Sequence, residues 1–261
     1  MFSNSIIFAF SLTFFAGIST GIGSLLCLMY KKFNPKFLGA MLGVSAGVMM
    51  YVSFVEILAK AKTSLSLVFG EKLGYSYTIL GFFIGILLMI LIDKLLPHHH
   101  ENKEDKNETS DKKLFRLGLF SALALSIHNF PEGLATFISA LDDPAYGVSI
   151  AFAITIHNIP EGIAVAIPIY YATKSRKKAF TYSFLSGLTE PIGALIGYFV
   201  LLQFIDESIF GAIFASVAGM MVYISINELL PTAQEYAGKK ISTYGFIAGM
   251  FVMAISLVLF L

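Results

Sequence analysis

One six-residue motif occurs twice in the middle of the chain, as HNFPEG at residues 128–133 and as HNIPEG at residues 157–162. Both copies lie inside long apolar segments, so each places an imidazole, an amide and a carboxylate where residues facing hydrocarbon are expected. Ionisable groups in such segments are costly and need partners, which makes them functional candidates. The organisation of the rest of the chain indicates what the two motifs form.

The composition around the motifs is that of an integral membrane protein. Of the 261 residues, 56% are hydrophobic and 13% are charged, and the mean hydropathy is +0.77. A soluble domain has about 25% charged residues. The net charge of +1 argues against a nucleic-acid-binding surface, and the single cysteine, Cys27, excludes an intramolecular disulfide. The first residues, MFSNSIIFAF, lack a basic region, so we expect a membrane helix there and not a cleaved signal.

Apolar runs long enough to cross a bilayer predict an all-α membrane protein with eight transmembrane helices. The predicted spans are residues 5–29, 37–59, 75–96, 115–141, 146–171, 179–203, 208–231 and 242–261. We treat residues 1–261 as one transmembrane domain. Residues 97–113 are strongly polar and are predicted to be a disordered loop. This loop contains His98, His99 and His100, which either bind metal or belong to a solvated polar tract.

The distribution of basic residues predicts the orientation in the membrane. Of the 18 lysines and arginines, 15 lie on the side of the loops that follow the odd-numbered spans. The opposite side holds Lys60, Lys62 and Lys72. Because basic loops stay in the cytoplasm, we expect both termini outside and residues 97–113 inside.

A longer repeat relates the two ends of the chain. Ala46–Leu58 and Ala218–Leu230 share seven identities in 13 positions, including Glu56 and Glu228 in the same register. The neighbouring spans also agree, so spans 1–3 resemble spans 6–8 in the opposite direction. Inverted repeats around a midplane site are typical of secondary transporters. The alternative is chance similarity between glycine- and alanine-rich helices, which the shared tyrosine, serine and glutamate make less favourable.

Within each motif the histidine and glutamate are four residues apart and share one helix face. Pro131 and Pro160 each free a backbone carbonyl four residues earlier, which protein or water must satisfy in a membrane. Gly133 and Gly162 allow close helix approach. These features predict kinked helices that line a wet cavity.

The spacing of the motifs predicts how they face each other. The two spans are consecutive and antiparallel around residues 144–145, so residues at equal depth have numbers that add up to about 289. His128 then lies opposite Glu161, and Glu132 lies opposite His157. Asn129 and Asn158 point about 100° away around their helices, toward a second metal position.

Imidazole and carboxylate together suit Zn²⁺, Fe²⁺, Mn²⁺ and Co²⁺, and several such metals including Cd²⁺ fit the same donors. The absence of cysteine from the motifs excludes a sulfur-rich structural site. Three further acids lie in apolar surroundings. Glu190 precedes a proline and is predicted as an added ligand. Glu56 and Glu228 are either ligands or structural and pore-mouth residues, and the sequence does not choose between these roles.

With these motifs in view, the sequence resembles the ZIP metal-ion transporters, in particular their bacterial ZupT-type branch. The resemblance covers essentially the full length. It rests on the two HNxPEG motifs, on GLTEP at residues 187–191 and on NELLP at residues 227–231. It implies eight helices in a 3+2+3 arrangement and uptake of Zn²⁺ and other divalent metals across the cytoplasmic membrane by alternating access. It also implies a homodimer, no organic cofactor and no enzymatic activity.

The resemblance further implies a binuclear site. His128, Glu132, His157 and Glu161 would hold the transported metal. The second position would use Asn129, Asn158 and Glu190 together with Glu56 and Glu228. In family mechanisms, spans 1, 4, 5 and 6 move as a block against spans 2, 3, 7 and 8.

Two rival functions share the same donors. Paired His/Glu helices also suit an intramembrane di-metal enzyme, which needs an open metal position and room for an organic substrate. A non-transporting metal sensor is the other rival, but no signalling domain accompanies the helices. No Walker A loop and no dinucleotide fingerprint occur, which argues against ATP-driven pumping.

Overall fold

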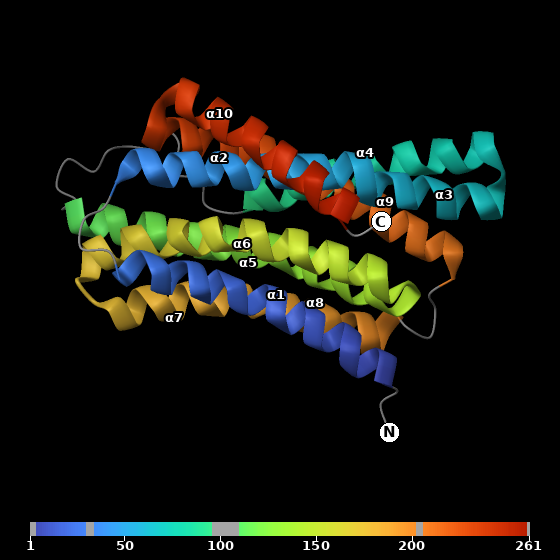
Figure 1. The fold of residues 1–261 in the computed structure, drawn as a ribbon, viewed down its shortest axis with the longest axis horizontal. Helices are drawn as coiled ribbons and strands as arrows, with labels where there is room; N and C mark the ends of the chain where they lie inside the picture. The colour runs from blue at the N-terminus through green and yellow to red at the C-terminus, as the bar shows by residue number, and fades with distance from the viewer. Residues whose placement is uncertain (1–3, 30–33, 96–109, 202–205, 260–261) are drawn as a thin grey trace.

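The computed structural model describes residues 4–29, 34–95, 110–201 and 206–259, and the regular structure in these ranges is entirely helical (Figure 1). The α-helices are α1 (Asn4–Met29), α2 (Pro35–Val52), α3 (Leu58–Phe69), α4 (Glu71–Leu95), α5 (Ser110–Asp142), α6 (Pro144–Thr173), α7 (Arg176–Gly187), α8 (Thr189–Ile196), α9 (Glu207–Ile224) and α10 (Leu230–Leu259). Three π-helical turns interrupt them: η1 (Ser53–Ile57), η2 (Gly197–Leu201) and η3 (Ser225–Leu229).

The predicted class, an all-α membrane protein, is confirmed. Among the described residues, five helical stretches are long and apolar enough to cross a bilayer. They are Asn4–Leu26, Pro35–Phe69, Glu71–Lys94, Pro144–Thr173 and Glu207–Val258. Large apolar side chains also lie on the outside, such as Phe83, Phe199 and Phe251, each at least 60% exposed. An apolar exterior of this kind suits lipid contact. The number of crossings, predicted as eight, stays a prediction.

Two predicted boundaries are wrong in the described residues. The helix that contains span 2 continues through α3 to Phe69, so Lys60 and Lys62 lie on a helix and not in a loop. The polar segment predicted as disordered is also shorter, because α5 begins at Ser110. Residues 97–109, including His98, His99 and His100, lie outside the residues that the structure describes.

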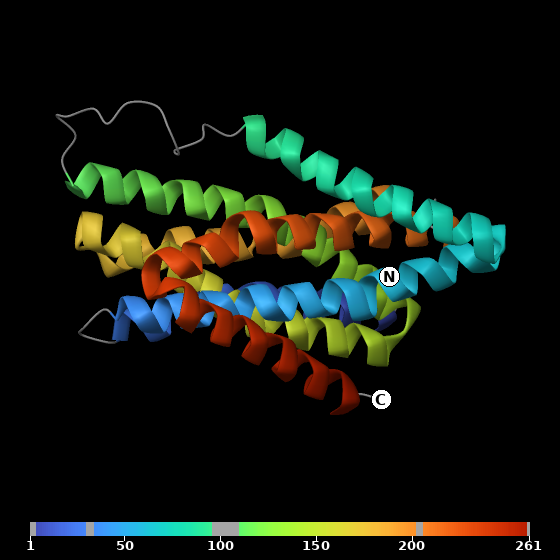
Figure 2. The same ribbon diagram turned by 90° about the horizontal axis from the view of Figure 1, so that it is seen from above.

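The predicted loop between spans 7 and 8 is replaced by a bend inside α10. Gly238 adopts φ 75° and ψ 160°, which interrupts the helical path at one residue. A backbone with this positive φ is readily available only to glycine. Figure 2 shows the two arms of α10 running back from this bend. The 52-residue stretch Glu207–Val258 is therefore a helical hairpin and not a single straight rod.

The helices pack into two groups, and Figure 1 shows the first group below the second. The first group contains α1, α5, α6, α7 and α8, with α6 in extensive contact with both α1 and α5. The second group contains α2, α3, α4, α9 and α10, with α2 packed on α10 and α4 packed on α9. The groups meet mainly where α2 crosses α6 and where α5 crosses α9. The first group takes in the helices of predicted spans 1, 4, 5 and 6, and the second takes in those of predicted spans 2, 3, 7 and 8.

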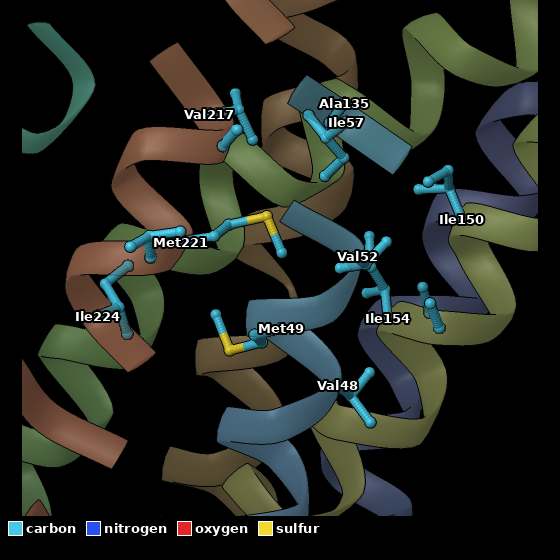
Figure 3. Close-up of a cluster of buried hydrophobic side chains, with 14 of the residues drawn as sticks. Val48, Met49, Val52, Ile57, Ala135, Ile150, Ile154, Val217, Met221 and Ile224 are labelled. Carbon is cyan, nitrogen blue, oxygen red and sulfur yellow. The ribbon is translucent and has the colours of Figure 1, made fainter. Parts of the chain in front are cut away.

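Part of the interface between the groups is an apolar seam. Val48, Met49 and Val52 of α2 lie between the second group's α9 and the first group's α6 (Figure 3). Their neighbours include Met221 of α9 and Ile154 of α6, and all five side chains are at most 2% exposed. Close packing of this kind stabilises the observed register without directional bonds.

The sequence repeat is also a repeat in packing. Gly47 of α2 lies against the Phe246 carbonyl of α10, and the equivalent Gly219 of α9 lies against the Phe82 carbonyl of α4. A Cβ at either glycine would overlap that oxygen. The π-helical turns η1 and η3 also fall at the same register, and each contains its repeat's glutamate. Equivalent residues therefore make equivalent contacts in the two halves of the second group.

Candidate metal centre

The turn between α5 and α6 fixes the register of the two motifs. Asp143 caps α6, because its carboxylate accepts hydrogen bonds from the backbone N–H groups of Ala145 at 2.8 Å and Tyr146 at 3.3 Å. Pro144 occupies the first helical position, where its missing N–H costs nothing. With this short connection, α5 and α6 run antiparallel in contact.

The predicted contact between Glu132 and His157 is present. Glu132 Oε1 lies 3.2 Å from His157 Nε2, and both side chains are fully buried. Glu161, one turn further along α6, is also buried. The backbone of His128 lies in α5, one turn before Glu132, but its side chain is outside what the structure describes. The second predicted contact, between His128 and Glu161, therefore stays a prediction.

The two motif asparagines point toward the other helices of the first group. Asn158 donates hydrogen bonds from Nδ2 to the Ala16 carbonyl of α1 at 3.0 Å and to Glu190 Oε1 of α8. Asn129 donates from Nδ2 to the Ser186 carbonyl of α7 at 3.2 Å. These bonds use the amide nitrogens as donors and so direct each amide oxygen elsewhere. Glu190, predicted as an added ligand, thus lies directly beside Asn158.

Several buried oxygens of this cluster accept no hydrogen bond from any described residue. They are Asn129 Oδ1, Glu132 Oε2, Asn158 Oδ1 and Glu190 Oε2. A buried acceptor without a donor costs free energy, about 1–3 kcal/mol and more when it is charged. Oxygens that lack donors are suitable partners for a cation.

The cluster also brings several carboxyl groups together. Glu190 is fully buried and lies within electrostatic reach of both Glu132 and Glu161. Within the part of the chain that the structure describes, no lysine or arginine acts on Glu190 in the same way. Buried carboxylates without a counter-charge are strongly unfavourable. Carboxylate, imidazole and amide oxygen are groups of the kind that bind divalent cations.

The described side chains alone do not complete a metal site. No three His, Cys, Asp or Glu groups among them are arranged to hold one ion, and His128 is missing from that comparison. The centre instead consists of two adjacent pairs, Glu132 with His157 and Asn158 with Glu190.

Glu56 and Glu228 lie in two of the π-helical turns, η1 and η3. Glu56 acts electrostatically on Tyr146 near the α5–α6 turn, whereas Glu228 acts on Tyr223 beside the end of α4. Both side chains are half-buried. Their role as ligands stays a prediction.

Sequence reasoning missed two polar residues of the second group, Ser45 and Asp93. Ser45 of α2 contacts the centre from the second group, and nothing in its small-residue surroundings marks it. Asp93 of α4 accepts hydrogen bonds from the Tyr223 hydroxyl at 2.7 Å and from Asn227 Nδ2 at 3.3 Å. An acid inside the apolar run of α4 was a signal for Asp93.

An ion pair joins the two groups at the end where α5 turns into α6. Lys60 Nζ of α3 lies 2.9 Å from Asp142 Oδ2, at the end of α5. The same ammonium lies 5.2 Å from the centre of the Tyr146 ring. Between this pair and the buried centre lies the apolar seam of α2 and α6.

The fold and the centre together define a polytopic helical membrane protein with a buried, cation-compatible polar cluster. Residues 93–257 match the model of the family described as ZIP zinc transporter. The chain belongs to this family, as its motifs predicted.

Relatives match along nearly the whole chain. "Zinc transporter ZupT" of Chlorobium chlorochromatii (strain CaD3) is 59% identical, over 99% of this chain and 99% of its own length. The protein of the same name from Chlorobaculum parvum is 59% identical, over 99% of this chain and 100% of its own. The Streptococcus mutans protein is 55% identical, over 97% of each chain. These relatives are named as transporters and not as enzymes.

Proposed function

We propose that the chain carries Zn²⁺ into the cytoplasm across the cytoplasmic membrane, and with it other divalent metals such as Fe²⁺, Mn²⁺, Co²⁺ and Cd²⁺. Membership of the ZIP family and the names of its relatives support zinc as the substrate. The observation that carries the proposal is the cluster of buried oxygens without hydrogen-bond donors at the α5–α6 contact. The rival enzyme reading gains no support from any of these relatives.

The substrate ion would pass through two adjacent positions in this cluster. In the first, His128, Glu132, His157 and Glu161 supply imidazole and carboxylate donors. In the second, the amide oxygens of Asn129 and Asn158 act with Glu190. A mixed set of nitrogen and oxygen donors, several of them neutral, favours a divalent ion without the very tight binding of a thiolate site.

The transport cycle would move the first group of helices against the second. We propose that the chain has eight transmembrane helices in a 3+2+3 arrangement, with both termini on the extracytoplasmic side. The movement would then carry the ion from that side to the cytoplasm. A homodimer would hold the second group in place in the membrane. The apolar seam supports such a movement, because surfaces without many directional bonds can take up a new register. The donors of the centre lie almost entirely in the first group and would travel with it.

Zinc flux into liposomes that contain purified protein and an enclosed zinc-sensitive dye tests the proposal. Glu132→Gln keeps the size of the side chain but removes a carboxylate from the pair with His157. We expect the initial rate of zinc entry to fall by at least about ten-fold. The control, Glu71→Gln, changes an exposed glutamate at the start of α4 and should transport normally. Zinc entry that is equally fast with Glu132→Gln would refute the proposed site.

A further inference from the structure

Ser45 connects the second group of helices to the centre. It lies on α2 and is fully buried. Its hydroxyl oxygen is 3.3 Å from Glu161 Oε1 and 3.3 Å from the backbone carbonyl oxygen of His157. One serine therefore reaches both a carboxylate of the centre and the α6 backbone at the preceding motif histidine.

This hydroxyl leaves its own helix, as does that of buried Ser183, whose two contacts are with backbone carbonyls, whereas Ser45 reaches a carboxylate of the centre. Ser19, Ser53 and Ser139 are also buried, and each donates to a carbonyl of its own helix, at 2.6, 2.6 and 2.7 Å. Such local bonding is the common arrangement for serine in a helix. Ser45 instead crosses from α2 to α6. Its side chain is thus directed by the centre and not by its own helix.

We propose that Ser45 is a positioning residue for the metal centre, and this rests on the proposed function. Its hydroxyl donates to Oε1 of Glu161 and fixes the orientation of that carboxylate. A carboxylate has about four acceptor positions, so one serine contact leaves capacity for an ion. The His157 carbonyl oxygen, also 3.3 Å away, is an acceptor as well and shares the single proton of this hydroxyl, which keeps Ser45 between these two groups of α6. Residues that orient metal ligands in this way typically change metal affinity by about 10–100-fold when they are removed.

Whether Ser45 can contact Glu161 depends on how the two groups of helices are positioned relative to each other. Ser45 belongs to the second group, whereas Glu161 belongs to the first. A shift of one group along the other separates the hydroxyl from the carboxylate. The centre then binds metal more tightly in the observed register than in a shifted one. By linkage, a bound ion stabilises the observed register, and loss of the serine contact assists release of the ion.

The test compares Ser45→Ala with the wild type in zinc binding and in zinc uptake. Titration calorimetry of the purified protein should show a zinc Kd raised by about ten-fold. Uptake into liposomes should show a matching rise in KM with a much smaller change in kcat. Ser45→Thr keeps the hydroxyl and should restore Kd and KM toward wild-type values. The matched control, Ser139→Ala, removes an equally buried hydroxyl that bonds within α5, and should leave both unchanged.

Each outcome decides the proposal. An unchanged Kd and KM in Ser45→Ala overturns the positioning role and leaves zinc transport intact. A fall in thermal stability and kcat without a change in Kd also overturns it, because that pattern belongs to a structural residue. If the wild type binds zinc but moves none into liposomes, the proposed function fails, while the Kd of Ser45→Ala still decides the role of Ser45. If Ser45→Thr does not fold, the comparison of Ser45→Ala with Ser139→Ala remains decisive.

Discussion

Glu190 illustrates what a buried carboxylate contributes when it shares a site with two others. It lies in α8, held by Asn158 and close to Glu132 and Glu161. Without an ion, ionisation of any one of these buried carboxyl groups is unfavourable, because the others lie close to it. With a divalent ion, the same groups become ligands. The contribution of this cluster to the stability of the fold should therefore be unfavourable without metal and favourable with metal bound.

The variant Glu190→Gln tests this at the scale of one residue. It replaces a buried ionisable carboxyl group with a neutral amide and retains an oxygen that accepts from Asn158. We expect the metal-free protein to become more stable, by on the order of 1–3 kcal/mol, and the stabilisation by zinc to decrease because the ion binds less tightly. Thermal unfolding with zinc and with a chelator measures both effects. The exposed Glu71→Gln is the control; a metal-free Glu190→Gln protein that melts earlier than wild type would contradict the argument.

The sequence predicts the contact between the two motifs better than the contacts that other helices make with them. Glu132 and His157 could be paired by numbering, because a short turn between two antiparallel helices places residues equally far from the turn at the same depth. Ser45 could not be found in this way, since nothing along the chain indicates that α2 crosses α6 at that depth. Residues that act through contacts between distant segments can be predicted only when the packing of those segments is known. The hydropathy pattern does not give that packing.

At the scale of helices, glycine contacts set how closely the first group packs. A Cβ on Gly162 of α6 would overlap the Thr20 carbonyl oxygen of α1. We expect Gly162→Ala to separate these helices and to reduce the free energy of unfolding by about 1–3 kcal/mol. Since Glu161 is the preceding residue, zinc affinity should fall as well.

Thermal unfolding and zinc titration of Gly162→Ala measure the two consequences. Gly197→Ala is the matched control, because its Cβ would meet only the side-chain atoms of Leu134 and Phe137, which can move. Equal stability of the two variants would show that the α1–α6 contact tolerates a methyl group, against this reasoning.

Hydropathy predicted where helices exist but not how some of them end. Lys60 and Lys62 marked the end of span 2, yet the helix continues to Phe69 because no proline or glycine stops it before Gly70. The bend in α10 was predicted as a loop. The helix is interrupted at one residue, Gly238, and the residues on both sides remain helical. A pattern of polar residues does not distinguish such a bend from a loop.

At the scale of the whole molecule, the division into two groups predicts that uptake requires relative movement. The pair Lys60 and Asp142 lies on opposite sides of this division and at its edge. With Cys27 first replaced by serine, the double variant Lys60→Cys and Asp142→Cys offers two thiols to a short cleavable cross-linker. We expect cross-linking to reduce zinc uptake to the level of protein-free liposomes, and cleavage of the linker to restore it.

The control pair lies within one group. Lys62 of α3 lies over the ring of Tyr75 of α4, with Nζ 5.4 Å from the ring centre. Cross-linking cysteines at these two positions should leave uptake unchanged, because α3 and α4 would move together. If mass spectrometry shows complete cross-linking at Lys60 and Asp142 while uptake continues, the two groups do not move apart at this edge during transport.

The equivalent glycine contacts of the second group also constrain how the protein is made. Gly47 finds its partner, Phe246, only near the end of the chain, and Gly219 turns back to Phe82. Helices from the first third of the chain thus pack directly against helices from the last third. Ribosomes add about 5–20 residues per second, so α2 emerges into the bilayer many seconds before α10 exists. During that interval its glycine-lined face has no protein partner, and a chain truncated before Gly238 would keep that face open to lipid and to quality-control proteases.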